Sequence, residues 1–235
     1  MICLETLCAV DVCVCTAQDV HENYSAYSEH VAPRFASRAE KLMAQGGHTS
    51  EKKALCELGC GVMLAGLAGV RQDFQLVYNP YGKPELAKGK PHISLSHTDG
   101  LAVCALAQQV VGIDAEVIPA ALSRYQILAL GRALGFPHER WAEPAPELME
   151  RAKTPEAWAR EWTRVEAVLK AIGTGFSLGP NQYLPLMKQW RCAWARCGDT
   201  IICCATQATP HIALATFDPG GWLECVEGTS HPPCS

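Results

Sequence analysis

Two acidic residues at the end of one apolar stretch are the first candidates for chemistry. Asp114 and Glu116 follow Val111, Gly112 and Ile113 and are separated by a single residue. In an extended strand, side chains two positions apart point to the same face, so both carboxylates can face one object. Two close carboxylates repel each other unless a cation lies between them or one is protonated. The pair therefore indicates a divalent-metal site, and a strand that ends in solvated acids is the alternative.

A third carboxylate lies on a predicted helix from Glu156 to Ile172. Within it Trp162, Glu166 and Lys170 recur every four residues. This spacing places the three side chains along one face of the helix. In the structural interpretation, Glu166 and Lys170 form a solvated ion pair one helical turn apart. In the functional interpretation, Glu166 is a third carboxylate of the site, with the cation Lys170 one turn after it and the aromatic Trp162 one turn before it.

Candidate contacts for an anion lie earlier in the chain. The segment His92 to His97 alternates apolar and polar residues and ends in Ser96 and His97. A turn with glycine and a second apolar segment follow, which together predict a hairpin. Lys83 stands between a glycine and a proline, in a loop that is stiff on one side and open to close approach on the other. A hydroxyl, an imidazole and an ammonium could therefore line a polar pocket.

Basic residues form only a short row. Arg34, Arg38 and Lys41 are spaced three or four residues apart in a predicted helix from Ser28 to Ala44, and they form either a solvated face or a phosphate-contacting edge. The whole chain has a net charge of -4, which argues against a nucleic-acid binder that relies on a broad basic field.

Composition indicates a globular, cytoplasmic protein. Of the 235 residues, 49% are hydrophobic and 19% charged, which excludes wholesale disorder. The N-terminus has no basic segment before its apolar residues, and the apolar stretch 55–70 contains Glu57 and is shorter than the roughly 20 residues of a membrane helix. We therefore expect no secretory signal and no membrane partner.

The sequence contains 13 cysteines, an odd number that cannot all pair within one chain. None forms a C-x-x-C motif, the spacing that zinc sites favour. We expect most of them to be small buried hydrophobic residues in a reducing compartment. A cysteine-rich metal-storage protein is the alternative.

The order of elements predicts an α+β fold. Periodicity indicates strands at 2–15, 74–78, 92–97, 101–107, 110–113, 189–196, 200–206 and 211–217, and helices at 28–44, 55–70, 122–134 and 156–172. The segment 137–155 has many prolines and charges and is predicted to be irregular. The element order repeats weakly, which predicts two pseudo-symmetric halves, 1–109 and 110–235. We expect each half to be a small, mainly antiparallel sheet with packed helices.

Four motifs in this order resemble the 4′-phosphopantetheinyl transferase superfamily, of the longer, surfactin-synthetase-activating type. They are Gly82-Lys83-Pro84, Ile93 to Thr98, Val111 to Glu116, and Trp162 to Ala171. The resemblance implies that the phosphopantetheine arm of coenzyme A is moved onto a serine of an acyl or peptidyl carrier protein. It also implies Mg²⁺ as cofactor and adenosine 3′,5′-bisphosphate as the released product.

The resemblance also assigns roles to single residues. It implies Asp114, Glu116 and Glu166 as Mg²⁺ ligands, and Glu166 and Lys170 as catalytic residues. The residues it implies for the phosphates of coenzyme A are Lys83, Ser96, His97, Arg38, Lys41 and Lys53. We expect a monomer whose partners are the carrier protein and coenzyme A, without nucleic acid.

Two alternatives remain for the function. Val165 stands where the family usually has a lysine, so the chain could be a relative that binds carrier protein or coenzyme A without transfer. Asp114 and Glu166 could instead form the acid pair of a glycosidase. The cations Lys83, His97 and Lys170 argue against that second alternative, because a sugar cleft needs no phosphate contacts.

Overall fold

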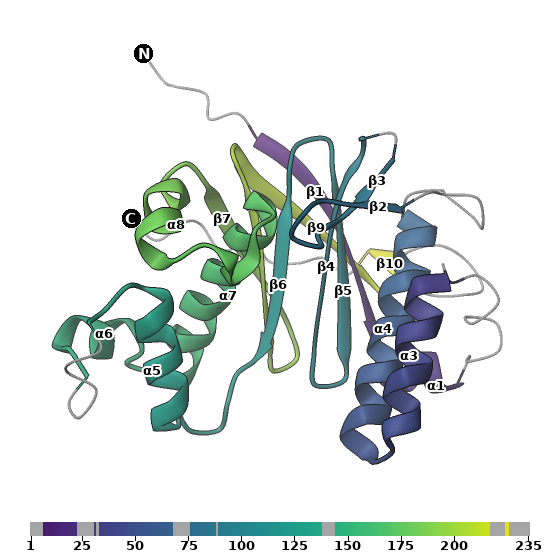
Figure 1. Cartoon of the computed structure of the whole chain (residues 1–235), viewed down its shortest axis with the longest axis horizontal. Helices are drawn as coiled ribbons and strands as arrows, with labels where there is room; N and C mark the ends of the chain where they lie inside the picture. Colours follow the sequence, from purple (N-terminus) through teal and green to yellow (C-terminus); the bar gives the residue numbers. More distant parts are fainter. Residues whose placement is uncertain are drawn as a thin grey trace.

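The fold is α+β, with three sheets in the middle and helices on either side of them (Figure 1). The computed structural model describes residues 7–22, 31, 33–67, 76–87, 89–137, 144–216 and 224–225. Its strands are β1 (Leu7–Thr16), β2 (Leu76–Tyr78), β3 (Pro84–Leu86), β4 (His92–Thr98), β5 (Leu101–Ala107), β6 (Gly112–Val117), β7 (Arg191–Cys197), β8 (Thr200–Thr206), β9 (Thr209–Thr216) and β10 (Glu224–Cys225). Its helices are α1 (Ala17–Glu22), α3 (Pro33–Gln45), α4 (His48–Leu67), α5 (Arg124–Ala133), α6 (Pro146–Arg151), α7 (Pro155–Ile172) and α8 (Pro180–Met187), with a 3₁₀ turn at Gly175–Ser177.

Strands from distant parts of the chain share the largest sheet, whose order is β10-β9-β1-β5-β4. Its pairs are antiparallel except for β1 and β9, which run parallel. The second sheet has the order β6-β8-β7, the third is the pair β2-β3, and both are antiparallel. The α+β class is confirmed. The boundary at 109/110 and the pseudo-symmetry of the halves stay predictions.

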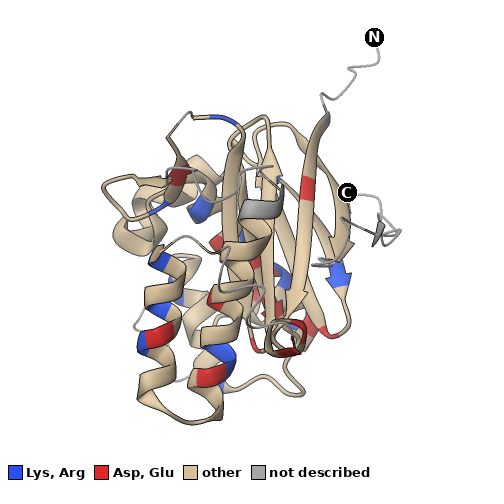
Figure 2. Cartoon of the chain, turned by 90° about the vertical axis from the view of Figure 1, so that its right-hand side faces the viewer, with Lys and Arg blue, Asp and Glu red and all other residues tan. Residues whose placement is uncertain are grey.

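Helices cover the sheets by burying apolar faces. One core lies between α3, α4 and the five-stranded sheet and includes Phe35, Leu58, Met63 and Ile93. Basic and acidic residues are interspersed along the helices on this side of the molecule (Figure 2). A second core fills the space between the two larger sheets, and a third lies under α7. Within the described ranges, none of the helices is long and apolar enough to cross a membrane.

Helix α7 has clear signals at both ends, which explains why its bounds could be predicted. Thr154 is the N-cap and accepts a hydrogen bond from the backbone N–H of Ala157, and Pro155 occupies the first helical position. Gly173 ends the helix in the left-handed conformation, with φ of 85°. A proline at the start and a glycine just past the end are the favoured residues at these places.

Strand β6 pairs differently from the prediction. The sequence predicts a strand at 110–113 that ends in the two acids and lies in one small meander with the hairpin β4-β5. Instead, β6 is an edge strand of a separate sheet, in which Asp114 and Glu116 pair with Cys203 and Ile201 of β8. The hydrogen bonds of its backbone are made to a strand that lies far away in the sequence, and local patterns carry no information about such a partner.

Helices α1, α6 and α8 were not predicted. Helix α6 lies inside the segment expected to be irregular, where Pro146 starts the helix rather than breaking it. Helix α8 likewise begins at Pro180, although Pro185 lies within it. Proline is tolerated in the first turn of a helix because the N–H groups there have no partner within the helix. The predictions for residues 2–6, 28–30, 32, 68–70, 74–75, 138–143 and 217 lie outside the described residues.

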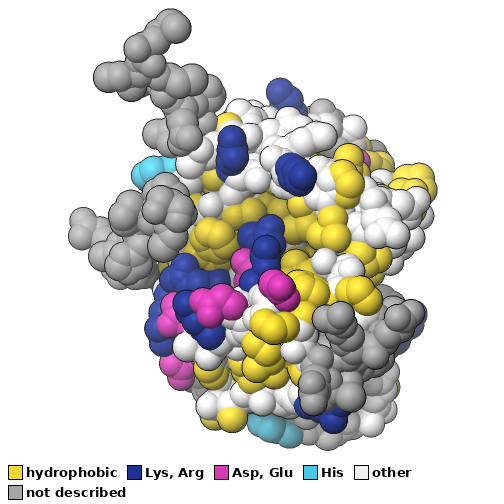
Figure 3. Space-filling view, turned by 90° about the vertical axis from the view of Figure 1, so that its left-hand side faces the viewer, with side chains coloured by type: hydrophobic (Ala, Val, Ile, Leu, Met, Phe, Trp, Pro, Cys, Tyr) yellow, Lys and Arg dark blue, Asp and Glu magenta, His cyan; other side chains and the backbone are white. Residues whose placement is uncertain are grey.

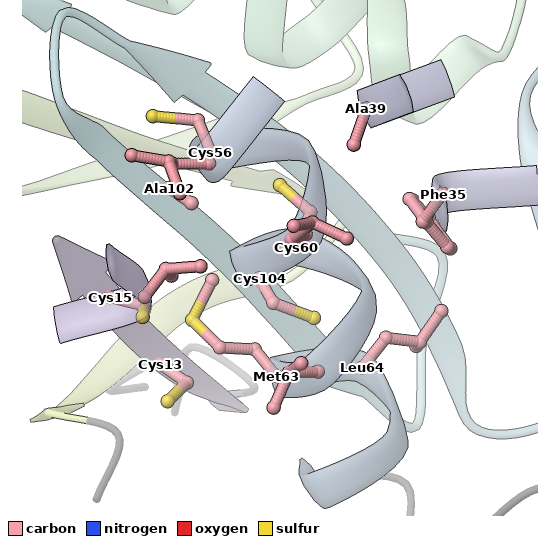
Figure 4. Close-up of a cluster of buried hydrophobic side chains, with 14 of the residues drawn as sticks. Cys13, Cys15, Phe35, Ala39, Cys56, Cys60, Met63, Leu64, Ala102 and Cys104 are labelled. Carbon is pink, nitrogen blue, oxygen red and sulfur yellow. The ribbon is translucent and has the colours of Figure 1, made fainter. Parts of the chain in front are cut away.

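The cysteines behave as small core residues. Figure 4 shows Cys13, Cys15, Cys56, Cys60 and Cys104 together in the core beneath α4. All ten cysteines with described side chains are free, and eight of them are buried. In the same part of the chain, no group of three His, Cys, Asp or Glu side chains could hold a metal ion. The prediction that most cysteines are small buried residues is confirmed for the described ones.

We expect Gly112→Ala to lower the free energy of unfolding by roughly 1–3 kcal/mol, as overpacking of a core does. A Cβ atom at this position would lie 1.9 Å from the carbonyl oxygen of Ala167 and 2.5 Å from the backbone nitrogen of Ala171. Backbone atoms cannot rotate away, so β6 and α7 would have to separate. Urea unfolding measures the change.

Gly179→Ala is the matched control for this substitution. The same added methyl group would find its nearest neighbour, Oε1 of Gln182, at 3.8 Å, which is an ordinary contact. Its cost should stay within about 1 kcal/mol, the size of a capping effect. Equal stability of Gly112→Ala and the unaltered protein would contradict the close contact between β6 and α7.

We expect iodoacetamide, at about pH 8, to modify Cys192 before Cys13 and Cys56, because the thiolate is the reactive form. Burial raises the pKa of Cys13 to about 12 and that of Cys56 to about 11. A hydrogen bond with the Cys203 thiol lowers the pKa of Cys192. Peptide mapping by mass spectrometry measures each modification, and labelling in urea provides the control. Equal labelling of Cys13 and Cys192 in the folded protein would contradict this assignment.

Candidate functional site

The site lies where the two larger sheets meet. Strand β4 is an edge strand of one sheet and β6 an edge strand of the other, and the two pack against each other. The Oγ atom of Ser94 accepts a hydrogen bond from the backbone N–H of Ile113, at 3.0 Å. The hydroxyl of Ser96 donates to Oδ1 of Asp114, at 2.8 Å. Serine side chains of β4 thus join the sheets and bring the Ser96 and Asp114 motifs together.

A cavity of about 500 Å³ lies at this junction. It is lined by most of the residues that the sequence singled out: Arg38, Lys83, Ser96, His97, Asp114, Glu116, Glu166 and Lys170. Lys41 and Lys53 do not line it, and their side chains are exposed. The roles assigned to all of these residues stay predictions, although eight of them now share one surface.

Asp114 is at the centre of a tight polar cluster. Its side chain is 5% exposed and its Oδ1 lies 2.6 Å from Nζ of Lys170. The same ammonium donates to Oγ of Ser96, at 2.7 Å. A buried carboxylate is costly unless it is paired, and Asp114 here has two donors. Strand β4, strand β6 and helix α7 each contribute one side chain to this cluster.

The carboxylate of Asp114 affects the pKa values of the other two acids, Glu116 and Glu166. Burial, followed by repulsion from Asp114, raises the pKa of Glu166 to about 7, and the Lys170 ammonium opposes the shift. Burial, followed by repulsion from Asp114 and Glu166, raises the pKa of Glu116 to about 7. Raised pKa values of this kind mark a group of carboxylates that attracts positive charge.

The donor set suits a hard divalent cation. Oδ1 of Asp114 and Oε2 of Glu166 lie 2.6 Å and 4.0 Å from the same ammonium nitrogen of Lys170, so they face a common point at which a cation is stable. Among the residues that the structure describes, no three His, Cys, Asp or Glu side chains form a group that could enclose a metal ion. Mg²⁺ usually binds one or two carboxylates and completes its shell with water and phosphate oxygens. The carboxylates present are of the kind that Mg²⁺ takes, and the Mg²⁺ site itself stays a prediction.

The opposite wall of the cavity carries cationic and polar groups around one buried acid. Oε1 of Glu57, on α4, lies 3.0 Å from Nε of Arg38 and 3.3 Å from Nε2 of His97. The guanidinium of Arg34 lies over the ring of Tyr78, 3.8 Å from its centroid. We call the cavity residues of α3, α4, β4 and the loop before β3 the basic wall. The cavity residues of β6 and α7, which include the three carboxylates and Lys170, form the other wall.

Lys83 contacts the end of helix α7. Its ammonium donates to the carbonyl of Ala171, at 3.1 Å, and burial lowers its pKa. Beside it, Nδ2 of Asn79 donates to the carbonyl of Gly173, at 2.7 Å. A cation near the last carbonyls of a helix is favourable because these groups carry partial negative charge. The loop that precedes β3 therefore holds the C-terminal end of α7.

Among the residues that line the cavity, Arg34, Tyr78 and Glu57 were not predicted as site residues. The guanidinium of Arg34 stacks on the ring of Tyr78. A signal for Glu57 exists, because it is the one acid within the apolar stretch 55–70. A buried acid requires a partner. Nothing local in the sequence identifies Arg38 and His97 as those partners, since they come from other elements.

Charges outside the cavity are mixed rather than separated by sign. Glu161 accepts hydrogen bonds from Arg151, at 2.9 Å, and from Arg164, at 3.0 Å. Figure 3 shows basic and acidic side chains in contact on one side of the molecule, beside hydrophobic ones. Exposed ion pairs of this kind contribute little to stability.

Comparison with known proteins agrees with the motifs. No protein-family model matches the chain. A protein of Synechocystis sp. (strain ATCC 27184 / PCC 6803 / Kazusa), provisionally named a 4′-phosphopantetheinyl transferase, is 30% identical over 118 residues. The match covers 48% of this chain and 46% of the relative, so the chain spans less than half of that relative's length. The resemblance to the 4′-phosphopantetheinyl transferase superfamily that the four motifs predict is thereby confirmed.

Proposed function

We propose that this protein moves the 4′-phosphopantetheine arm of coenzyme A onto a serine of an acyl or peptidyl carrier protein, in the presence of Mg²⁺. The observation that carries this proposal is one cavity with basic groups on one wall and three carboxylates on the other. Coenzyme A has a pyrophosphate and a further phosphate, so it needs cationic donors at several points. A hard metal ion is needed where its charge is greatest.

Coenzyme A would bind with its phosphates toward the basic wall. Arg38, His97 and Lys83 line that wall and come from three separate elements, so they can contact different phosphate groups. Asp114, Glu116 and Glu166 would hold Mg²⁺ beside the pyrophosphate. When bound, the ion supplies positive charge that stabilises the transferring phosphoryl group.

In the transfer step, Oγ of the carrier serine forms a bond to the β-phosphorus of coenzyme A. The bond from that phosphorus to the bridging oxygen breaks, and adenosine 3′,5′-bisphosphate leaves with the oxygen. Glu166 would accept the serine proton, since its carboxylate lines the cavity beside the ammonium of Lys170. The ammonium of Lys170 stabilises the negative charge that grows on the leaving phosphate.

A relative that binds coenzyme A or carrier protein without transfer is the second candidate. Val165 is fully buried in the core under α7, so this position directs no cation into the cavity. Arg164 is paired with Glu161, which removes it as a substitute. The family motif usually has a lysine at position 165, and this departure is the specific observation that favours the second candidate.

We expect Asp114→Asn to reduce transfer at least about a hundredfold, because it removes a charge that faces the reacting phosphates. Asparagine keeps the shape of the side chain, and circular dichroism shows whether the variant remains folded. The assay is the gain in mass of apo carrier proteins from the source genome, incubated with coenzyme A and Mg²⁺.

Asp99→Asn is the control for Asp114→Asn. Asp99 lies outside the cavity, its side chain is 72% exposed, and it pairs with Lys52. The substitution therefore removes the same charge as Asp114→Asn, but from an exposed position. We expect its transfer rate to match that of the unaltered protein. If Asp114→Asn transferred the arm at the normal rate, the role of Asp114 would be wrong.

We also expect excess chelator to stop transfer and to weaken the binding of coenzyme A, and added Mg²⁺ to restore both. The reason is that three carboxylates repel the phosphates unless a cation lies between them. Calorimetry measures binding and the mass assay measures transfer. Mg²⁺-dependent binding without transfer to any carrier would support the second candidate function, and full transfer in excess chelator would contradict the role of Mg²⁺.

A further inference from the structure

A buried carboxylate on α4 takes no part in the transfer step described above. The side chain of Glu57 is 7% exposed and lies among the apolar residues of that helix. Replacing a buried ion pair by apolar side chains is often neutral or stabilising, so stability gives no reason for an acid at this position. The reason must be sought in what Glu57 contacts.

Helix α4 is held on β4 at the level of His97. The thiol of Cys56 donates to the carbonyl of Thr98, at 3.8 Å, and the thiol of Cys60 donates to that of Ser96, at 3.5 Å. Each is a weak hydrogen bond. Because these carbonyls lie on either side of residue 97, the contacts align the intervening turn of α4 with His97, and Glu57 lies in that turn.

Glu57 holds two groups of the basic wall at once. Its Oε1 atom is in contact with Nε of Arg38 and with Nε2 of His97, whose side chains are 57% and 31% exposed. The contacts occupy one nitrogen of each partner. The terminal N–H groups of Arg38 can therefore donate to an anion in the cavity, and Nδ1 of His97 can donate to it when both ring nitrogens carry a proton. A long arginine side chain loses much rotational freedom when it is held in this way before the ligand arrives.

We propose that Glu57 is a positioning residue, which fixes Arg38 and His97 as a preformed pair that receives a phosphate group of coenzyme A. This inference rests on the proposed function. Glu57 acts through its two neighbours and does not contact the ligand. Its effect falls on the affinity for coenzyme A rather than on the transfer step, because the three carboxylates and Lys170 lie on the opposite wall.

The test compares Glu57→Leu and Glu57→Gln, with Asp99→Asn as the control for loss of a carboxylate. We expect Glu57→Leu to raise the KM for coenzyme A about tenfold and to leave kcat within about twofold, since the lost contacts are made to charged groups. Glutamine still offers an oxygen acceptor, so Glu57→Gln should recover part of the affinity. Asp99→Asn should leave KM unchanged.

Comparing the effect of Glu57→Leu in two backgrounds shows whether Glu57 acts through its neighbours. In a background that carries both Arg38→Ala and His97→Ala, Glu57→Leu should cause no further loss of coenzyme A affinity in calorimetry. An equal loss in both backgrounds would overturn the proposal. An unchanged KM for folded Glu57→Leu would also overturn it.

Nuclear magnetic resonance of the His97 ring separates this proposal from the proposed function. In the ligand-free protein, we expect one sharp set of ring signals, and broadened or shifted signals in Glu57→Leu. If the unaltered protein neither binds nor transfers coenzyme A, the proposed function fails, while the ring signals still decide whether Glu57 positions His97. Identical ring signals in the two proteins would refute the positioning role.

Discussion

The close contact between β6 and α7 is the constraint on which the site depends. At Gly112 the strand approaches the helix so closely that no side chain fits between them. Because side chains alternate along a strand, Asp114 and Glu116 face the same helix as Gly112. On that helix, Glu166 and Lys170 lie one turn apart and line the same cavity. A glycine that carries no chemistry itself thus brings three carboxylates and a lysine together.

This arrangement gathers negative charge that the protein only partly neutralises. Lys170 pairs with Asp114 at 2.6 Å and lies 4.0 Å from Glu166, and Glu116 has the third carboxylate. Burial raises the pKa values of Glu116 and Glu166, and repulsion among the three carboxylates, which one ammonium cannot balance, raises them further. A divalent cation would supply the missing charge and would itself attract phosphate oxygens. The same charge balance accounts for the basic groups on the opposite wall.

Much of the site could be predicted because its residues lie in short, regular segments. The face of α7 and the polar end of β4 follow from periodicity, and the caps of α7 follow from Thr154, Pro155 and Gly173. The pairing of β6 with β8 could not be predicted, because register between distant strands is decided by packing. The same holds for Glu57. Its sequence context shows a buried acid, and only the fold shows which cations surround it.

Direct hydrogen bonds join the two walls of the cavity. Among them are those from Ser96 to Asp114, from Asn79 to the carbonyl of Gly173, and from Lys83 to that of Ala171. Moving β6 and α7 together away from β4 and the loop before β3 would break all three, so these contacts set the distance between the walls before any ligand binds. Groups held in this way lose little freedom on binding. A phosphate that draws Lys83 toward itself would have to compete with the carbonyl of Ala171 for the ammonium group. Ala171 is the residue after Lys170 on α7, so a phosphate bound by Lys83 would weaken a contact at the end of the helix that carries Lys170.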